Sequence, residues 1–83
     1  MSILNNIGNT QLVEIRGVKV KLEYLNPSGS VKDRIVKYIV EYAERRGLLK
    51  RGYTLVEAST GNTGIAVSFV GAVKGYKVHI FIP

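Results

Sequence analysis

The fold of this chain is decided by residues 54–82, which read TLVEASTGNTGIAVSFVGAVKGYKVHIFI. Residues 54–58 and 77–82 have the short apolar patterns of strands. Residues 63–74 between them have the composition of a helix, and Gly75 follows as a typical helix-ending residue. The order strand, helix, strand predicts a βαβ unit with two parallel strands. We therefore expect an α/β fold.

This unit is too apolar to stand alone. In the predicted helix 63–74 only Ser68 and Lys74 are plainly polar, and such a helix needs cover on more than one side. The strand 77–82 is equally apolar, and parallel sheets are normally buried on both faces. We expect residues 1–83 to form a single, incomplete α/β segment.

The N-terminal half adds two strands and a helix. Residues 12–15 predict a short strand, and residues 18–24 alternate so that Val18, Val20, Leu22 and Tyr24 share one face. Residues 26–29, Asn-Pro-Ser-Gly, are typical of a turn.

The first helix is expected to begin with a capping box, in which Ser30 is paired with Asp33, and to end at Gly47. Its predicted apolar stripe contains Val31, Ile35, Ile39, Val40 and Ala43. Its predicted outer face contains Lys37, Glu41, Glu44 and Arg45.

Composition excludes several classes of function. The 83 residues contain no cysteine and one histidine, which excludes disulfides, thiolate chemistry and a histidine-rich metal site. No apolar run reaches the roughly 18 residues of a membrane span, and no secretory signal pattern opens the chain, so we expect a cytoplasmic protein. The net charge is +6, but the basic residues are interspersed with acidic ones and form no run interleaved with aromatic residues. This pattern favours a solvated surface and predicts no nucleic-acid partner.

The loop 59–64, Ser-Thr-Gly-Asn-Thr-Gly, joins the carboxyl end of a predicted strand to a predicted helix. Ligands of open α/β sheets bind at such ends, and the free N–H groups of a helix start favour an anion. A simple polar cap would need only one of these hydroxyl or amide residues. The loop matches neither G-x-x-x-x-G-K-[ST] nor G-x-G-x-x-G. An anion site for a carboxylate or phosphate and a capped polar turn both remain open here.

Lys32 lies where a helix is predicted to start, in LNPSGSVKDR at residues 25–34. A cation in the first helical turn faces the positive end of the helix dipole, which is unfavourable by about 0.3 to 1 kcal/mol. Gly29 and Ser30 open the backbone beside it. A solvated surface lysine and a functional amine are both compatible with this position.

Four stretches together resemble a known family: GNTQLVEI, NPSGSVKDR, AERRGLLKRG and EASTGNTGIA. They are similar, in order and spacing, to the N-terminal part of cysteine synthase (O-acetylserine sulfhydrylase), a fold-type II, pyridoxal-phosphate-dependent enzyme with a tryptophan synthase β-like fold. The resemblance implies that Lys32 is the Schiff-base lysine and the base for the substrate's α-proton. It implies that Asn62 binds the cofactor ring. It assigns the substrate's α-carboxylate to the loop residues Ser59, Thr60, Gly61, Asn62 and Thr63.

The resemblance also implies a β-replacement that makes L-cysteine from O-acetylserine, or O-phosphoserine, and sulfide. Val31 before the lysine favours cysteine synthase or a cystathionine β-synthase relative, because threonine synthases and dehydratases usually carry phenylalanine there. Gln11 replaces the usual proline, and Ser59-Thr60 reverses the usual order.

The family's cofactor-phosphate loop, its serine facing the pyridine nitrogen and its second domain have no counterpart in these 83 residues. We therefore expect the isolated chain to be inactive, either as a segment of a complete enzyme or as a non-catalytic homologue that binds a partner. We also expect self-association or a homodimer, because the apolar helix 63–74 and strand 77–82 would leave an uncovered patch.

Overall fold

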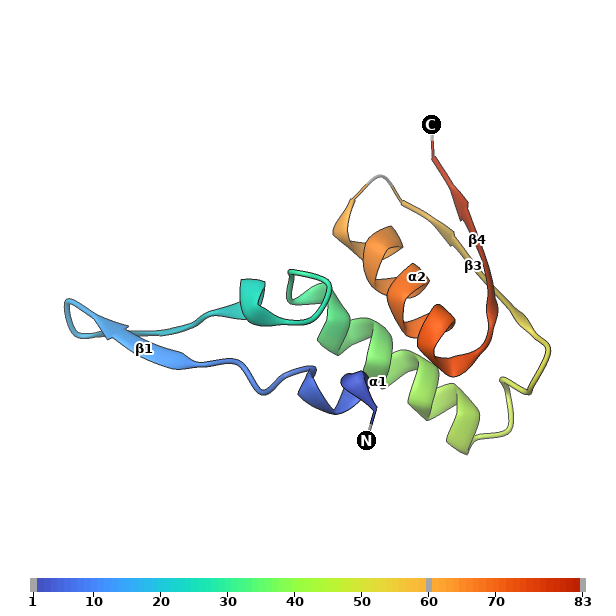
Figure 1. Ribbon diagram of the computed structural model, residues 1–83, viewed down its shortest axis with the longest axis horizontal. Helices are drawn as coiled ribbons and strands as arrows, with labels where there is room; N and C mark the ends of the chain where they lie inside the picture. Colours follow the sequence, from blue (N-terminus) through green and yellow to red (C-terminus); the bar gives the residue numbers. More distant parts are fainter. Residues whose placement is uncertain (1, 60, 83) are drawn as a thin grey trace.

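The computed structural model describes residues 2–59 and 61–82 (Figure 1). Short 3-10 helices and two pairs of strands accompany two α-helices. In chain order the elements are η1 (Ile3–Asn6), β1 (Leu12–Ile15), β2 (Val18–Lys21), η2 (Glu23–Leu25), α1 (Lys32–Arg45), β3 (Thr54–Ala58), α2 (Asn62–Lys74) and β4 (Lys77–Phe81). Among the described residues, no helix is long and apolar enough to cross a membrane.

The predicted βαβ unit is confirmed. Strands β3 and β4 pair in parallel, from Thr54 opposite Lys77 to Ala58 opposite Phe81, with α2 as the crossover. Gly75 ends α2 in the left-handed conformation, with φ of 84°. Helix α2 packs on both strands, and α1 packs on α2 (Figure 1).

The core lies between the two helices and the sheet. Its buried side chains come from η1 and the residue after it, from α1 and from α2: Leu4, Ile7, Val36, Val40, Ala66, Val67 and Val70. Gly71 brings α2 close to β4, because a Cβ atom there would overlap Cγ2 of Val78. The cover expected for α2 is partly present, since Ile65 and Val73 stay exposed.

The predicted start of α1 is wrong in its capping. Ser30 Oγ accepts a hydrogen bond from the backbone N–H of Lys32, at 3.2 Å, but Asp33 does not return to Ser30. Instead the Asp33 carboxylate accepts bonds from the N–H and the hydroxyl of Ser28, and the residue is fully buried. The turn before α1 brings the N–H and the hydroxyl of Ser28 close to the Asp33 carboxylate. Asp33 therefore accepts from Ser28 and not from the backbone N–H of Ser30, as a capping box would require.

The predicted stripe of α1 is only partly correct. Val40 is buried, but the second buried apolar residue is Val36, whereas Val31, Ile35 and Ile39 are 42%, 45% and 58% exposed. The helix is rotated because α2, rather than the sheet, covers its inner face.

One residue of the predicted outer face of α1 makes contacts that the sequence pattern did not show. Glu44 accepts hydrogen bonds from Lys74 Nζ at 2.9 Å and from the Tyr76 hydroxyl at 2.6 Å. Burial opposes ionisation of Glu44, but the bonds from Lys74 and Tyr76 outweigh it, so its pKa is lowered. The same contact raises the pKa of Tyr76 to about 12, chiefly through its hydrogen bond to Glu44.

The first two strands form a hairpin that projects from the helices (Figure 1). They pair antiparallel from Leu12 opposite Lys21 to Ile15 opposite Val18, around a turn in which Arg16 and Gly17 have φ of 50° and 81°. The predicted strand 18–24 ends at Lys21, because the chain turns into η2.

Candidate functional site

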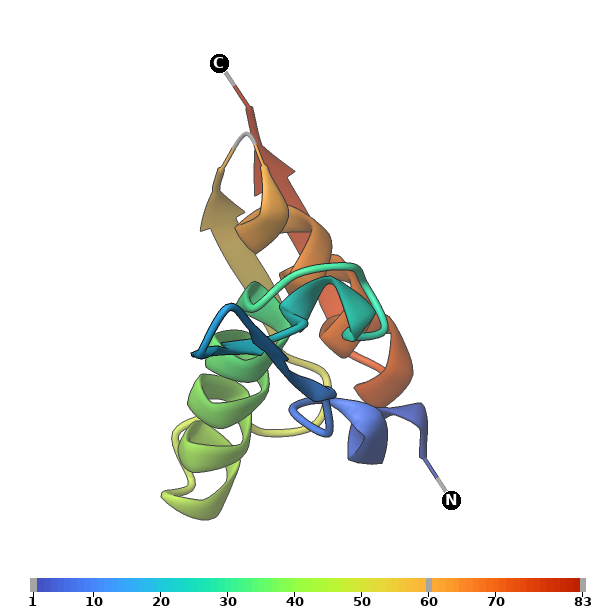
Figure 2. The ribbon, with the colours of Figure 1, turned by 90° about the vertical axis from the view of Figure 1, so that its left-hand side faces the viewer.

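Two helix N-termini meet at one end of the molecule. Lys32 is the first residue of α1, and Asn62 is the first residue of α2. Two views at right angles show that both helices begin at the same end, beside the carboxyl end of β3 (Figure 1, Figure 2). The two segments singled out from the sequence are therefore neighbours in space, although about 30 residues separate them in the chain.

The loop before α2 is held by Ser59. Its Oγ accepts bonds from the backbone N–H groups of Gly61 at 3.3 Å and Gly64 at 3.2 Å, so one hydroxyl stabilises the helix start. The Ser59 hydroxyl hydrogen is still able to donate. Among the described residues, the side chains and backbone N–H groups of Asn62 and Thr63 have no hydrogen-bond partner. Thr60, also predicted for this site, lies outside the described residues.

Lys32 is the candidate amine at the start of α1. It is half-buried, and among the described residues its ammonium forms neither an ion pair nor a hydrogen bond. Gly29 turns the chain just before it with φ of 99°, and a Cβ atom there would meet nothing within 4 Å. This open space lies at Gly29 itself, and its effect on Lys32 stays a prediction.

A polar network around Arg34, two residues after Lys32, was not predicted from the sequence. Arg34 Nε donates to Glu23 at 2.5 Å, and Arg34 Nη2 donates to the carbonyl of Gly8 at 2.7 Å. The Thr10 hydroxyl donates to the other oxygen of Glu23 at 2.6 Å. The hydrogen bond from Arg34, followed by that from Thr10, lowers the pKa of Glu23 to about 2.

Asn26 ties the same network to the preceding turn. It is buried, at 3% exposure, and its Nδ2 donates to the carbonyl and the carboxylate of Glu23, each at 3.0 Å. Its Oδ1 accepts from the N–H of Gly8 at 2.8 Å. The sequence showed Asn26 as part of a turn, and no local pattern marks an asparagine whose partner lies 18 residues away.

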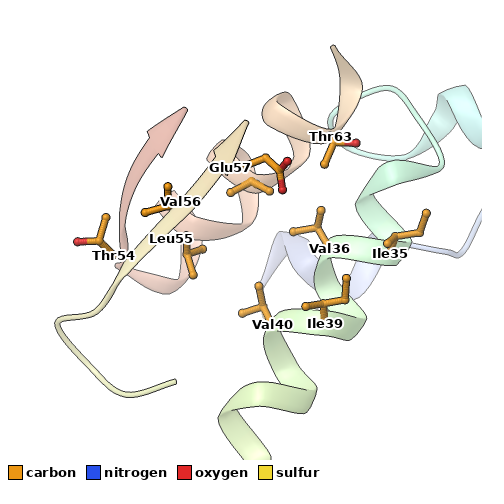
Figure 3. A pocket seen from close by; sticks show the side chains of 10 residues that line it. Ile35, Val36, Ile39, Val40, Thr54, Leu55, Val56, Glu57 and Thr63 are labelled. Carbon is orange, nitrogen blue, oxygen red and sulfur yellow. The ribbon is translucent and has the colours of Figure 1, made fainter. Parts of the chain in front are cut away.

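Two grooves flank this end of the molecule. One, of about 270 Å³, lies between α1 and β3 and is lined mainly by aliphatic side chains, with Glu57 and Thr63 at one end (Figure 3). It contains the exposed Ile35 and Ile39. The other, of about 480 Å³, lies beside the loop and includes Ser59, Gly61 and Ser68.

The family assignment follows from this geometry together with a family comparison. A primary amine can attach a carbonyl cofactor, and the N–H groups at a helix start can bind an anion. The chain belongs to the pyridoxal-phosphate dependent enzyme family, whose model matches residues 3–83.

The individual relatives are cysteine synthase-like, as expected. The chain is 49% identical over 90 residues to a cysteine synthase of Staphylococcus aureus (strain Mu50 / ATCC 700699), covering 99% of this chain and 29% of the relative. The solved O-acetylserine sulfhydrylase isoform 3 of Entamoeba histolytica is 44% identical with a TM-score of 0.88, covering 95% of this chain and 27% of that one. The O-acetylserine dependent cystathionine β-synthase of Helicobacter pylori is 30% identical with a TM-score of 0.89, covering 99% and 30%.

These comparisons confirm the fold-type II assignment. The chain spans less than a third of the length of the relatives that it matches. The residues present fit the family's cofactor: Lys32 supplies a primary amine, and Asn62 and Thr63 supply N–H donors that the described residues leave unused. Pyridoxal phosphate is thus the cofactor expected of this family.

Proposed function

We propose that this chain supplies the lysine and the carboxylate-binding loop of a cysteine synthase, which makes L-cysteine from O-acetylserine or O-phosphoserine and sulfide. The observation that carries the proposal is that Lys32 and the loop 59–63 start two packed helices at one end of a single α/β unit. Groups held on rigid elements keep their spacing better than groups on free loops.

Lys32 has two tasks in this proposal. Its amine attaches the cofactor, and once released it takes the proton from the substrate's α-carbon. When bound, pyridoxal phosphate supplies an electron sink for the α-carbanion. Asn62 orients the cofactor ring through its side-chain amide.

The loop binds the substrate's α-carboxylate. The unused N–H groups of Asn62 and Thr63 point out of the N-terminus of α2, where the helix dipole carries about half a positive charge. Gly61 gives close access to the backbone, and the hydroxyls of Ser59 and Thr60 are the further donors that we assign to this carboxylate. These donors favour a carboxylate over a neutral group.

A cystathionine β-synthase-like activity is the second candidate. The Helicobacter pylori enzyme, named as O-acetylserine dependent, matches nearly the whole chain with a TM-score of 0.89. Both candidates need the same lysine and carboxylate loop and differ in the nucleophile that enters afterwards. A comparison of sulfide with a larger thiol as the second substrate would separate them.

The proposal is tested by combining this chain with the remaining part of a close cysteine synthase, expressed separately. We expect no cysteine formation by the 83-residue chain alone, because the family's phosphate loop is not among its residues. The mixture should form cysteine, and Lys32→Ala should abolish it, whereas Lys19→Ala on the exposed hairpin should not. Cysteine formation by the isolated chain would contradict the expectation that this chain is inactive alone. An inactive mixture of two folded pieces would favour the non-catalytic homologue.

We also propose that the chain associates with itself, as a homodimer or larger species, or with a partner. Strands β3 and β4 form a two-stranded sheet among the described residues, and Val56 and Phe81 on it, with Ile82 just after β4, are 61% to 71% exposed. Exposed apolar patches with free strand edges favour association. Sedimentation at micromolar concentration should show species larger than a monomer. A monomer that binds no hydrophobic dye would contradict this.

A further inference from the structure

The side chains of the two residues after Lys32 form hydrogen bonds that attach the start of α1 to earlier parts of the chain. We propose that Asp33 and Arg34 are positioning residues, which fix the direction of Lys32 by anchoring the first turn of α1 to three earlier parts of the chain. This inference rests on the proposed role of Lys32. It adds a function for a polar network that neither the cofactor nor the substrate is proposed to touch.

The first anchor is local. The Asp33 carboxylate accepts the backbone N–H of Ser28 at 2.8 Å and also the Ser28 hydroxyl, and Asp33 is fully buried. The turn between them is further closed by the N–H of Gly29, which donates to the carbonyl of Asn26 at 2.8 Å. A buried carboxylate that lost these donors would be left unsatisfied, which is strongly unfavourable. The turn and the helix start therefore move as one piece.

The second anchor is long-range. Arg34 donates to both oxygens of Glu23, at 2.5 and 3.2 Å, and to the carbonyl of Gly8 at 2.7 Å. With the Thr10 hydroxyl oxygen at 3.3 Å as a fourth acceptor, the planar guanidinium has little freedom to rotate. Since Asn26 also bonds both Gly8 and Glu23, the network closes on itself. Segments 8–10 and 23–26 thereby form a fixed support under residue 34.

These two sets of hydrogen bonds also determine the direction in which Lys32 leaves the helix, because of the geometry of an α-helix. Successive side chains in an α-helix are about 100° apart around the axis. With Asp33 and Arg34 each held on its own side, rotation of the first turn is blocked. Lys32 must then leave the helix on the remaining side. The Cα–Cβ bond of Lys32 is thereby directed without a contact from its own side chain.

The test is borohydride trapping of pyridoxal phosphate on the full chain, followed by peptide mass mapping of every lysine. The measured quantity is the fraction of label on Lys32 relative to the other lysines. Ser28→Ala removes one bond to Asp33 and keeps the backbone bond, so the fold should persist. Ser28→Thr keeps the hydroxyl and is the matched rescue. Arg34→Lys keeps the positive charge but loses the planar guanidinium that bonds both oxygens of Glu23. Glu14→Gln, on the exposed hairpin, is the control.

We expect the selective label on Lys32 to fall about 2- to 10-fold in Ser28→Ala and in Arg34→Lys, the factor for one lost hydrogen bond, and to return in Ser28→Thr. Hydrogen exchange of the amides in residues 28–33 should quicken in the same two variants. Variants that melt earlier but keep wild-type selectivity and exchange would show a purely structural role and overturn the inference. Uniform labelling of all lysines in the unaltered chain would also overturn the inference, whereas the proposed function is decided separately by the mixture with the remaining part of a cysteine synthase.

Discussion

The close approach of α2 to β4 predicts the behaviour of Gly71→Ala. In an open helix interior this substitution stabilises by about 1 kcal/mol, because alanine is the better helix former. Here the new Cβ overlaps Cγ2 of Val78 and lies 3.3 Å from Cδ1 of Leu55. Both neighbours stand on strands of one sheet, so neither moves alone. Overpacking of this kind costs about 1 to 3 kcal/mol. We expect a net loss of up to about 2 kcal/mol.

The assay is a double-mutant cycle with Val78→Ala, followed by urea denaturation. Val78→Ala alone should destabilise, because it removes partly buried methyl groups. In the double variant the overlapping methyl is gone, so Gly71→Ala should become neutral or stabilising. The coupling energy should be about 1 to 3 kcal/mol. Two changes that add within about 0.5 kcal/mol would refute the account of Gly71 as a close-packing glycine.

Three further results are expected from titration and turn geometry. The bond from Arg34 holds the pKa of Glu23 at about 2, so the stability that it provides is complete above about pH 4.5 and is lost toward pH 2. Arg34→Gln should flatten the stability-against-pH curve in that window, and an unchanged slope would contradict the coupling. The hydrogen bond to Glu44 raises the pKa of Tyr76 from 10.0 to about 12. The stability that this bond provides is therefore present below pH 10 and is lost as the pH rises to about 12. Tyr76→Phe should remove this loss of stability from thermal melts recorded between pH 10 and about 12. Gly29→Ala should cost about 1 to 2 kcal/mol in urea melts because φ there is 99°, and no loss would show that the turn adopts another conformation.

The sequence predicted the βαβ unit correctly because its signals are local. The period of apolar residues, a glycine at the helix end and a polar loop lie within a few residues of the feature that they specify. The hairpin strand 12–15, the parallel pairing of β3 with β4 and the stop at Gly75 were therefore correct. The lysine and loop motifs also came from the sequence, through the family resemblance, and the roles of their residues stay predictions.

The tertiary structure decided what the sequence pattern could not contain. Asp33 has the spacing of a capping box, yet it is buried against Ser28, and Asn26 looked like a turn residue, yet it bonds Gly8. The predicted stripe of α1 missed the buried Val36 because its rotation depends on α2, which comes later in the chain. Hydrogen-bond partners 18 to 26 residues apart are chosen by how the segments pack. A repeat along one element shows which residues share a face, but only the neighbouring element decides which face is buried.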